Sequence, residues 1–239
     1  MTGAMRVLVG TSGYAYKEWK GAFYPEKLPA DGMLRFYAGR LPTVEINNTF
    51  YRLPSERLLA GWADQVPPGF RFGLKASQRI THLSRLTDFE ALEYFLRTAN
   101  VLGERLGPTL FQLPPTMRKD LPRLRDFLAR LPRGWRAAVE FRHPSWFDEE
   151  VYAALRERDA ALVVVDQDEG ETPLVPTASW GYLRLRRTTY DGAALAGWAR
   201  RIRAQPWSEA FAFLKHDDEP GQANGPRWAE ELAGLAAAG

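Results

Sequence analysis

Cysteine is absent from this chain of 239 residues. Without it no disulfide can form, no thiolate can bind a metal, and no cysteine can act as a nucleophile. Long apolar runs are also missing, because no stretch approaches the roughly 18 apolar residues that a membrane-spanning helix needs. The opening residues MTGAMRVLVG lack the basic and apolar regions of a signal peptide. We therefore expect a cytoplasmic protein with no membrane partner.

Lysine is scarce, with six residues among 32 lysines and arginines. Arginine presents a rigid, planar set of donors that suits phosphate and carboxylate groups. The net charge of +3 and the isoelectric point of about 9.2 are only mildly basic. They do not by themselves indicate a dedicated nucleic-acid-binding protein.

Short apolar runs alternate with amphipathic segments along the whole chain, as in successive βα units. Apolar stripes with helical spacing lie between most of the runs, for example over residues 89–99 and 121–131. Segment 167–178 has no helical period. The pattern predicts an α/β fold, a (β/α)8 TIM barrel that is irregular between strands six and seven, as one domain over residues 1–239. The eight expected strands are 6–10, 43–47, 70–76, 109–113, 137–142, 161–166, 181–186 and 210–215.

Polar residues occur at or near the end of nearly every expected strand. Barrel strands bury both faces, so a charge there is costly unless it is paired or used. Residues two apart on a strand point the same way, and TIM barrels keep their active sites at the carboxyl ends of the strands. The residues in question are Glu45, Asn47, Lys75, Gln112, Glu140, Arg142, Asp166, Tyr182, Arg184, Arg186, Lys215 and His216.

Two interpretations of these charges stay open. In the first, the carboxylates neutralise the cations in a structural ring of ion pairs. In the second, the cations bind an anion such as a phosphate or carboxylate. Loops after strands seven and eight often hold phosphate in this fold, and here they bring arginines with Lys215, close to the expected start of the last helix at Asn224.

A divalent metal is a further possibility, because carboxylates and histidines are its usual ligands. The candidates are Glu45, Glu140, Asp166, His143 and His216, although no HExxH or paired-histidine motif supports them. Lys75 or Lys215 can form a Schiff base if burial lowers its pKa, and simple pairing with a carboxylate is the alternative.

Aromatic residues alternate with lysines in the first loop, GTSGYAYKEWKGAFYPEKLP. Tyr16 and Trp19 beside Lys17 and Lys20 can stack on bases and meet phosphates, and Tyr51 adds to them from the second loop. The other interpretation is that these aromatics pack as a lid over the barrel. The segment is too short for a dinucleotide-binding or Walker loop.

With these motifs in view, the sequence resembles the family called domain of unknown function 72. The resemblance runs through VGTSGY, GAFYP, TVEINNTFYRLP, FRFGLKAS with ITH, LFQLPP, AVEFRHPSW, the strand end at Asp166 and YLRLRR. It implies a TIM barrel and does not itself name a reaction. Matched motif by motif, it implies site residues at Trp19, Glu45, Asn47, Tyr51, Lys75, His82, Gln112, Glu140, Arg142, Trp146, Asp166 and Arg184.

The last two βα units depart from the family pattern. The family usually has a histidine and a glycine after the arginine of strand seven, where this chain has Arg186 and Arg187. An asparagine-rich end of strand eight is replaced here by FLKHDDEPGQANGP. The resemblance therefore gives no support for roles of Lys215 and His216.

Our leading hypothesis is an enzyme, a hydrolase, isomerase or lyase, that acts on a phosphodiester, nucleotide or sugar phosphate. Lys75, Arg142 and Arg184 would bind the phosphate, and Glu45 or Glu140 would act as general acid and base because two nearby carboxylates titrate apart. Asp166 and Lys75 complete the catalytic candidates, and Lys215 joins the binding residues. The competing hypothesis is a non-catalytic barrel that binds nucleic acid through its aromatic loops.

Overall fold

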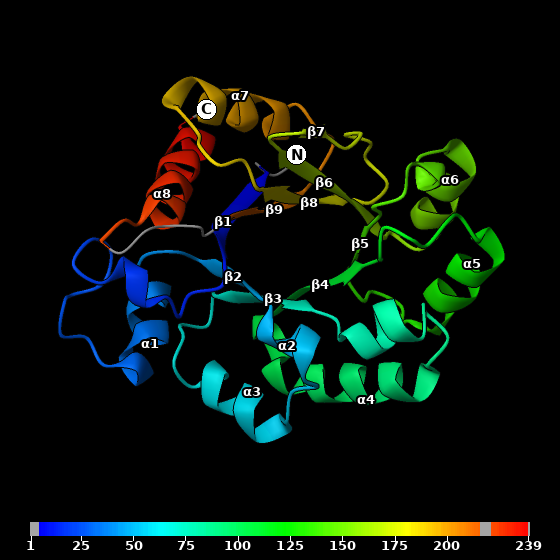
Figure 1. Ribbon diagram of the computed structural model, residues 1–239, viewed down its shortest axis with the longest axis horizontal. Coiled ribbons are helices and arrows are strands. Elements are labelled where there is room, and N and C mark those ends of the chain that lie inside the picture. Colours follow the sequence, from blue (N-terminus) through cyan, green and yellow to red (C-terminus); the bar gives the residue numbers. More distant parts are fainter. Residues whose placement is uncertain (1–4, 216–220, 239) are drawn as a thin grey trace.

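The structure is a computed structural model, which describes residues 5–215 and 221–238. Eight parallel strands form a closed barrel, in which β5 pairs with both β4 and β6. The predicted TIM barrel is thus confirmed (Figure 1). The strands of the barrel are β1 (Arg6–Ser12), β2 (Thr43–Ile46), β3 (Arg71–Lys75), β4 (Leu106–Gln112), β5 (Ala137–Glu140), β6 (Ala161–Gln167), β8 (Trp180–Leu185) and β9 (Glu209–Leu214).

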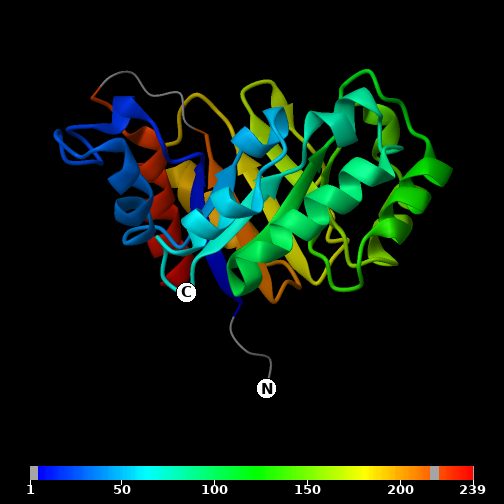
Figure 2. The same cartoon turned by 90° about the horizontal axis from the view of Figure 1, so that it is seen from below.

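Helices surround the strands, as Figures 1 and 2 show from two directions. The expected helix over 89–99 is present, and the carboxylate of Asp88 caps its first turn by accepting a hydrogen bond from the amide of Ala91. The helices are α1 (Met33–Ala38), α2 (Asn48–Tyr51), α3 (Glu56–Ala63), α4 (Phe89–Ala99), α5 (Leu121–Arg130), α6 (Glu149–Arg156), α7 (Gly192–Arg203) and α8 (Asn224–Ala237). Within the described part of the chain, none of them is long and apolar enough to cross a membrane.

The irregular unit lies where the sequence predicts it. Between β6 and β8 the chain forms only the short strand β7 (Gly170–Glu171), which pairs antiparallel with the end of β6. The hydroxyl of Thr172 accepts a hydrogen bond from the amide of Val165, and the hydroxyl of Thr177 accepts one from the amide of Leu162. Threonine side chains therefore fix this segment against β6 in place of a packed helix.

The barrel interior has an apolar lower part, toward the amino ends of the strands, and a polar upper part, toward their carboxyl ends. The lower part is a separate buried cluster of side chains from inside the strands, and it includes Leu8, Leu110, Val163, Phe211 and Phe213. Because side chains on one face recur every second residue, the next inward position on most strands is polar. The apolar cluster thus forms a dry floor beneath the polar residues at the carboxyl ends.

The close approach of β1 to β2 generates a test of the fold. A Cβ at Gly10 would lie 2.0 Å from the backbone oxygen of Thr43, which cannot move without disturbing the sheet. We expect Gly10→Ala to lower the free energy of unfolding in urea by about 1–3 kcal/mol, the range for overpacking.

Gly61→Ala is the matched control, since no atom lies within 4 Å of its added Cβ. It sits inside α3, where alanine should stabilise by about 0.5–1 kcal/mol. Equal effects of the two substitutions would contradict the predicted close contact.

Candidate functional site

Arg184 bridges two buried glutamates at the carboxyl end of the barrel. Its guanidinium donates two hydrogen bonds to Glu45, from Nε to Oε2 at 2.9 Å and from Nη2 to Oε1 at 2.8 Å. Nη1 donates to Oε2 of Glu140 at 2.8 Å. All three side chains are at most 3% exposed. One cation thus joins β2, β5 and β8 across the barrel interior.

Other donors complete the hydrogen bonding of each carboxylate. Glu45 also accepts bonds from the hydroxyls of Ser12 and Tyr182, at 2.9 and 2.8 Å, and from the amide of Asn47 at 3.1 Å. Glu140 also accepts bonds from Gln112 at 2.7 Å and from Nε of Arg142 at 3.2 Å. The structure therefore brings together six of the predicted site residues, namely Glu45, Asn47, Gln112, Glu140, Arg142 and Arg184.

The two carboxylates are strongly held in the ionised form. Burial alone would raise the pKa of Glu45, but the charge and hydrogen bonds of Arg184 overcome it and hold the pKa at about 2. The pKa of Glu140 is likewise lowered, because Arg184 and Arg142 outweigh its burial. A general acid must carry a proton near neutral pH, and a strong base needs a pKa close to it. The arrangement therefore disfavours Glu45 and Glu140 in the acid and base roles predicted for them.

Lys75 lies beside this network without joining it. Its Nζ is 4.1 Å from the centre of the Phe50 ring. Within residues 5–215 and 221–238 this amine makes no hydrogen bond or ion pair. Burial and the charge of Arg184 lower its pKa to about 8, against the opposing effect of Glu45 and Glu140. The side chain is only half-buried, so it can reach a molecule in the mouth.

Arg186 is a further cation at the mouth. It follows β8 on the same face as Arg184. Burial first, and the charge of Arg184 second, lower its pKa. Among the described residues its guanidinium forms no hydrogen bond or ion pair. The mouth therefore holds positive charge that its carboxylates do not match.

His82 lies on a π-helical turn, Arg79–Leu83, directly after β3. Its ring meets Phe50 edge to face with centroids 4.9 Å apart, and its Nδ1 is 2.9 Å from Oγ1 of Thr81. Burial and the charge of Lys75 lower its pKa, so the imidazole is neutral at pH 7. π-helical turns are rare and often mark functional sites.

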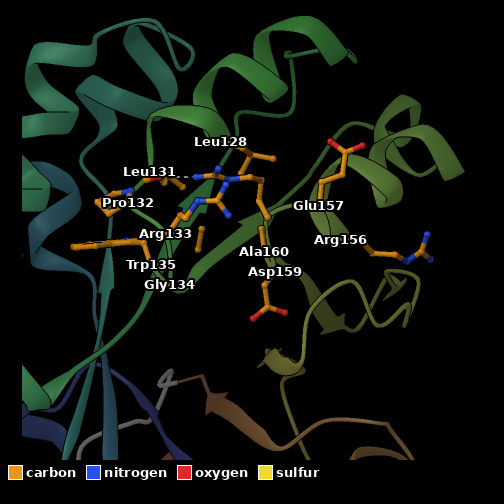
Figure 3. A pocket seen from close by; sticks show the side chains of 12 residues that line it. Leu128, Leu131, Pro132, Arg133, Gly134, Trp135, Arg156, Glu157, Asp159 and Ala160 are labelled. Atoms are coloured by element: carbon orange, nitrogen blue, oxygen red, sulfur yellow. Dashed lines mark hydrogen bonds between the residues drawn. The ribbon is translucent and has the colours of Figure 1, made fainter.

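A pocket of about 330 Å³ opens beside the glutamate network. It is lined from the ends of β4, β5 and β6 and includes Glu140, Arg142 and Gln167. A second pocket, of about 230 Å³, lies at the amino ends of β5 and β6, at the opposite end of the barrel. Its charged side chains Arg156, Glu157 and Asp159 do not converge on one point (Figure 3). We therefore place the candidate site at the mouth, where Glu140 and Arg142 line the first pocket, while Lys75, His82 and Arg186 lie outside its lining.

Three predicted site residues lie apart from the mouth. Asp166 is fully buried on the outer face of β6, where it accepts hydrogen bonds from Arg187, Tyr190 and Trp198. Strand parity explains this, because Val163 and Val165 face the barrel interior and Asp166 must face α7. Asp166 thus links β6 through hydrogen bonds to the loop after β8 and to α7.

The two predicted tryptophans are packing residues. Trp19 has no exposed surface and is surrounded by Tyr16, Phe23 and Tyr24. Trp146 is also buried, stacks on Phe141 and donates its indole N–H to the carbonyl of Met117. Neither ring can contact a ligand without a rearrangement of the core. Tyr51, in contrast, is 73% exposed beside Phe50.

The remaining predicted positions involve metal binding and the end of β9. No group of three or more histidine, aspartate or glutamate side chains in the described ranges could hold a metal ion. The oxygens of Glu45 and Glu140 already accept hydrogen bonds, and Arg184 keeps them beside a positive charge. Lys215 follows β9, and its amide donates to the carbonyl of Leu185. His216 lies outside the described residues.

Sequence reasoning missed Ser12 and gave Phe50 no defined role at the site. The expected first strand ends at residue 10, whereas β1 continues to Ser12 and turns its hydroxyl to Glu45. Phe50 precedes the predicted Tyr51 in the second loop, and its ring contacts both Lys75 and His82. The two-residue alternation of β1, continued past Gly10, was the signal that pointed to Ser12.

The buried bridge makes Arg184 a structural residue first. We expect Arg184→Met to lower the free energy of unfolding by about 3–5 kcal/mol, because it leaves two buried carboxylates without a cation. Urea unfolding at pH 7 measures this. Arg201→Met is the control, since its pair with Glu171 is partly exposed and should cost at most about 1 kcal/mol. A similar small loss in both variants would contradict the bridge.

The bridge also predicts a loss of stability in acid. A carboxyl with a pKa of about 2 when folded and about 4.3 when unfolded stabilises the fold above pH 4.3. That contribution is lost as the pH falls toward 2. Urea unfolding between pH 6 and pH 2.5 should show this decline in the wild type and a shallower one in Glu45→Gln. A wild type whose stability is flat over this range would contradict the lowered pKa.

Comparison with known proteins agrees with the fold. The family model described as "Protein of unknown function DUF72" matches residues 8–238. UPF0759 protein YecE of Escherichia coli K12 is 33% identical over 140 residues, or 56% of this chain and 52% of that protein. The match thus spans about half the length of YecE. UPF0759 protein YunF of Bacillus subtilis is 24% identical, over 89% of this chain and 79% of its own length.

Solved structures show the same barrel. A DUF72 family protein of Thermotoga maritima superposes with a TM-score of 0.79 and 27% identity, covering 97% of this chain and 99% of its own. A methyltransferase from Methanosarcina mazei, with a TM-score of 0.59 and 10% identity over 99% and 94% of the two chains, shares the fold alone. Because the family model covers nearly the whole chain, this protein belongs to the DUF72 family.

Proposed function

We propose that this protein is a cytoplasmic enzyme that binds a phosphate-bearing substrate at the barrel mouth, through Lys75, Arg142 and Arg186. The observation that carries the proposal is the surplus of positive charge. Four cations, Lys75, Arg142, Arg184 and Arg186, surround two carboxylates, Glu45 and Glu140. Since Arg184 engages both carboxylates, the other three cations have most of their donors free for a ligand.

The geometry supports different roles for Arg184 and Arg142. Arg184 is 3% exposed and uses Nε and both terminal nitrogens on glutamates, so its role is to position the site. The Arg142 side chain is 44% exposed, and only its Nε meets Glu140. Its two terminal nitrogens can therefore present the paired donors that bind phosphate well. The sequence predicts Lys75, Arg142 and Arg184 as the phosphate-binding residues, and this proposal keeps Lys75 and Arg142 and replaces Arg184 by Arg186.

The chemical step in this proposal belongs to Lys75 and His82. A pKa of about 8 for Lys75 lies close to the range in which proton transfer is efficient at neutral pH. The lowered pKa of His82 keeps its ring neutral and able to accept a proton. The low-dielectric floor of aromatic and aliphatic side chains beneath the mouth strengthens their interaction with a charged substrate. Glu45 and Glu140 then act through Arg184, by fixing its position and the charge around the site.

The nucleic-acid alternative keeps only part of its support. Trp19, Phe23 and Tyr24 are buried, which leaves Tyr51 as the strongly exposed aromatic of the two loops. One exposed ring beside the mouth suits a single base or sugar better than a run of stacked bases. We therefore favour a small phosphate compound over an extended nucleic acid.

Thermal unfolding in the presence of ligands tests the binding site. Inorganic phosphate, ribose 5-phosphate, nucleotides and a short oligonucleotide are compared, and a ligand at 100 times its Kd adds about 2.7 kcal/mol to the stability. We expect a small phosphate compound to raise the Tm of the wild type, and the double variant Arg142→Ala, Arg186→Ala to lose that rise.

Arg6→Ala serves as the control, because this arginine pairs with Glu209 at the amino ends of β1 and β9, opposite the mouth, and should keep the full rise in Tm. Stabilisation by the oligonucleotide alone, abolished by added salt, would support nucleic-acid binding instead. No rise in Tm with any phosphate compound would contradict the proposal.

A further inference from the structure

Lys75 differs chemically from the arginines around it. Arginine stays protonated at every pH that proteins experience, whereas an amine can lose its proton and become a nucleophile. The aromatic ring of Phe50 lies 4.1 Å from Nζ and offers no proton acceptor. Glu45 and Glu140, the nearest acidic groups, are held by Arg184. Lys75 therefore has no carboxylate partner among the described residues, although two carboxylates belong to the same site.

We propose that Lys75 forms a Schiff base with the carbonyl carbon of an aldehyde or ketone that carries a phosphate group. This inference rests on the proposed function for its anion site and adds the reactive group of the substrate. Arg142 and Arg186 would hold the phosphate while the carbonyl carbon reaches Nζ. Holding both ends of one molecule makes the attack effectively unimolecular, which can contribute several kcal/mol to lowering the barrier.

The step conserves atoms and charge. The lone pair of the neutral amine attacks the carbonyl carbon, a C–N bond forms, and the C=O π pair moves to oxygen, which takes up a proton. Nitrogen then gives up a proton, leaving a carbinolamine. Protonation of its hydroxyl lets water depart, and the nitrogen lone pair forms the C=N bond. In total, the amine, the carbonyl compound and one proton give an iminium ion and one water.

His82 is placed to carry these protons. The hydroxyl of Thr81 donates its single proton to the carbonyl of Ser77, at 3.2 Å. The same hydroxyl lies 2.9 Å from Nδ1 of His82, and in the tautomer with its proton on Nδ1 the ring donates this bond. This tautomer leaves a lone pair on Nε2, which can accept a proton from nitrogen and return it to the departing oxygen. Lys75 and His82 pack on the same ring, that of Phe50.

The charges that face Lys75 favour its neutral form. Arg184 and Arg142 act with burial to release the proton, while Glu45 and Glu140 oppose them, and the pKa stands at about 8. About a tenth of the amine is then neutral at pH 7, roughly 200-fold more than for a lysine of ordinary pKa. An iminium ion keeps the positive charge at nitrogen, so it retains the contact with the Phe50 ring.

Pyridoxal 5′-phosphate is a suitable probe, because it joins an aldehyde to a phosphate. The protein is incubated with it at pH 7, reduced with borohydride and digested, and the six lysines are compared by mass spectrometry of their peptides. We expect Lys75 to be labelled at least 10-fold faster than Lys27. Pyridoxal, which lacks the phosphate, should label Lys75 at least 10-fold more slowly.

Variants separate the reaction from binding. Lys75→Met should abolish the fast labelling, Lys27→Met should leave it unchanged, and His82→Gln should slow it. Labelling of Lys75 no faster than that of Lys27 would overturn the inference. If phosphate still raised the Tm in that case, the proposed anion site would stand without the Schiff base. Fast labelling by pyridoxal and its phosphate alike, without a rise in Tm, would instead contradict the anion site.

Discussion

The hydrogen-bonded bridge of Glu45, Arg184 and Glu140 joins three strands on different sides of the barrel. A buried charge is costly, and each of these groups is tolerated only because the others are present with the correct geometry. The bridge fixes the positions of β2, β5 and β8 relative to one another. It also sets the electrostatics of the mouth, because Arg184 engages both carboxylates, which leaves Lys75 without an ion pair among the described residues and Arg142 with a single bond to Glu140.

The polar end of the barrel depends on the apolar end. Side chains such as Phe211 and Phe213 fill the interior beneath the bridge. They keep water from reaching the bridge from the amino end of the barrel. Exclusion of water strengthens every charge interaction above them. The same exclusion favours the neutral form of the Lys75 amine. The packed apolar side chains therefore contribute both to the stability of the barrel and to the lowered pKa of Lys75.

Several roles changed between sequence and structure for reasons of geometry. Arg184 and Arg142 are both arginines near strand ends, and their depth in the barrel makes one a buried bridge and leaves the other half-exposed. Asp166 lies one residue before the end of β6 and Glu140 ends β5, but the parity of β6 turns Asp166 outward to α7. The aromatic first loop combines the two patterns of a lid and a stacking surface, and packing around Trp19 assigns its larger rings to the interior.

The sequence by itself determined the number and order of the strands, the irregular unit after β6 and the polar character of the strand ends. These follow from hydrophobic periodicity and parity, which are local properties of the chain. Only the tertiary structure decided which charges pair and which stay available. Pairing depends on distances between strands far apart in sequence, such as the 2.8 Å between Arg184 and Glu45. Burial, which sets the pKa of Lys75, likewise exists only once all the strands have closed around it.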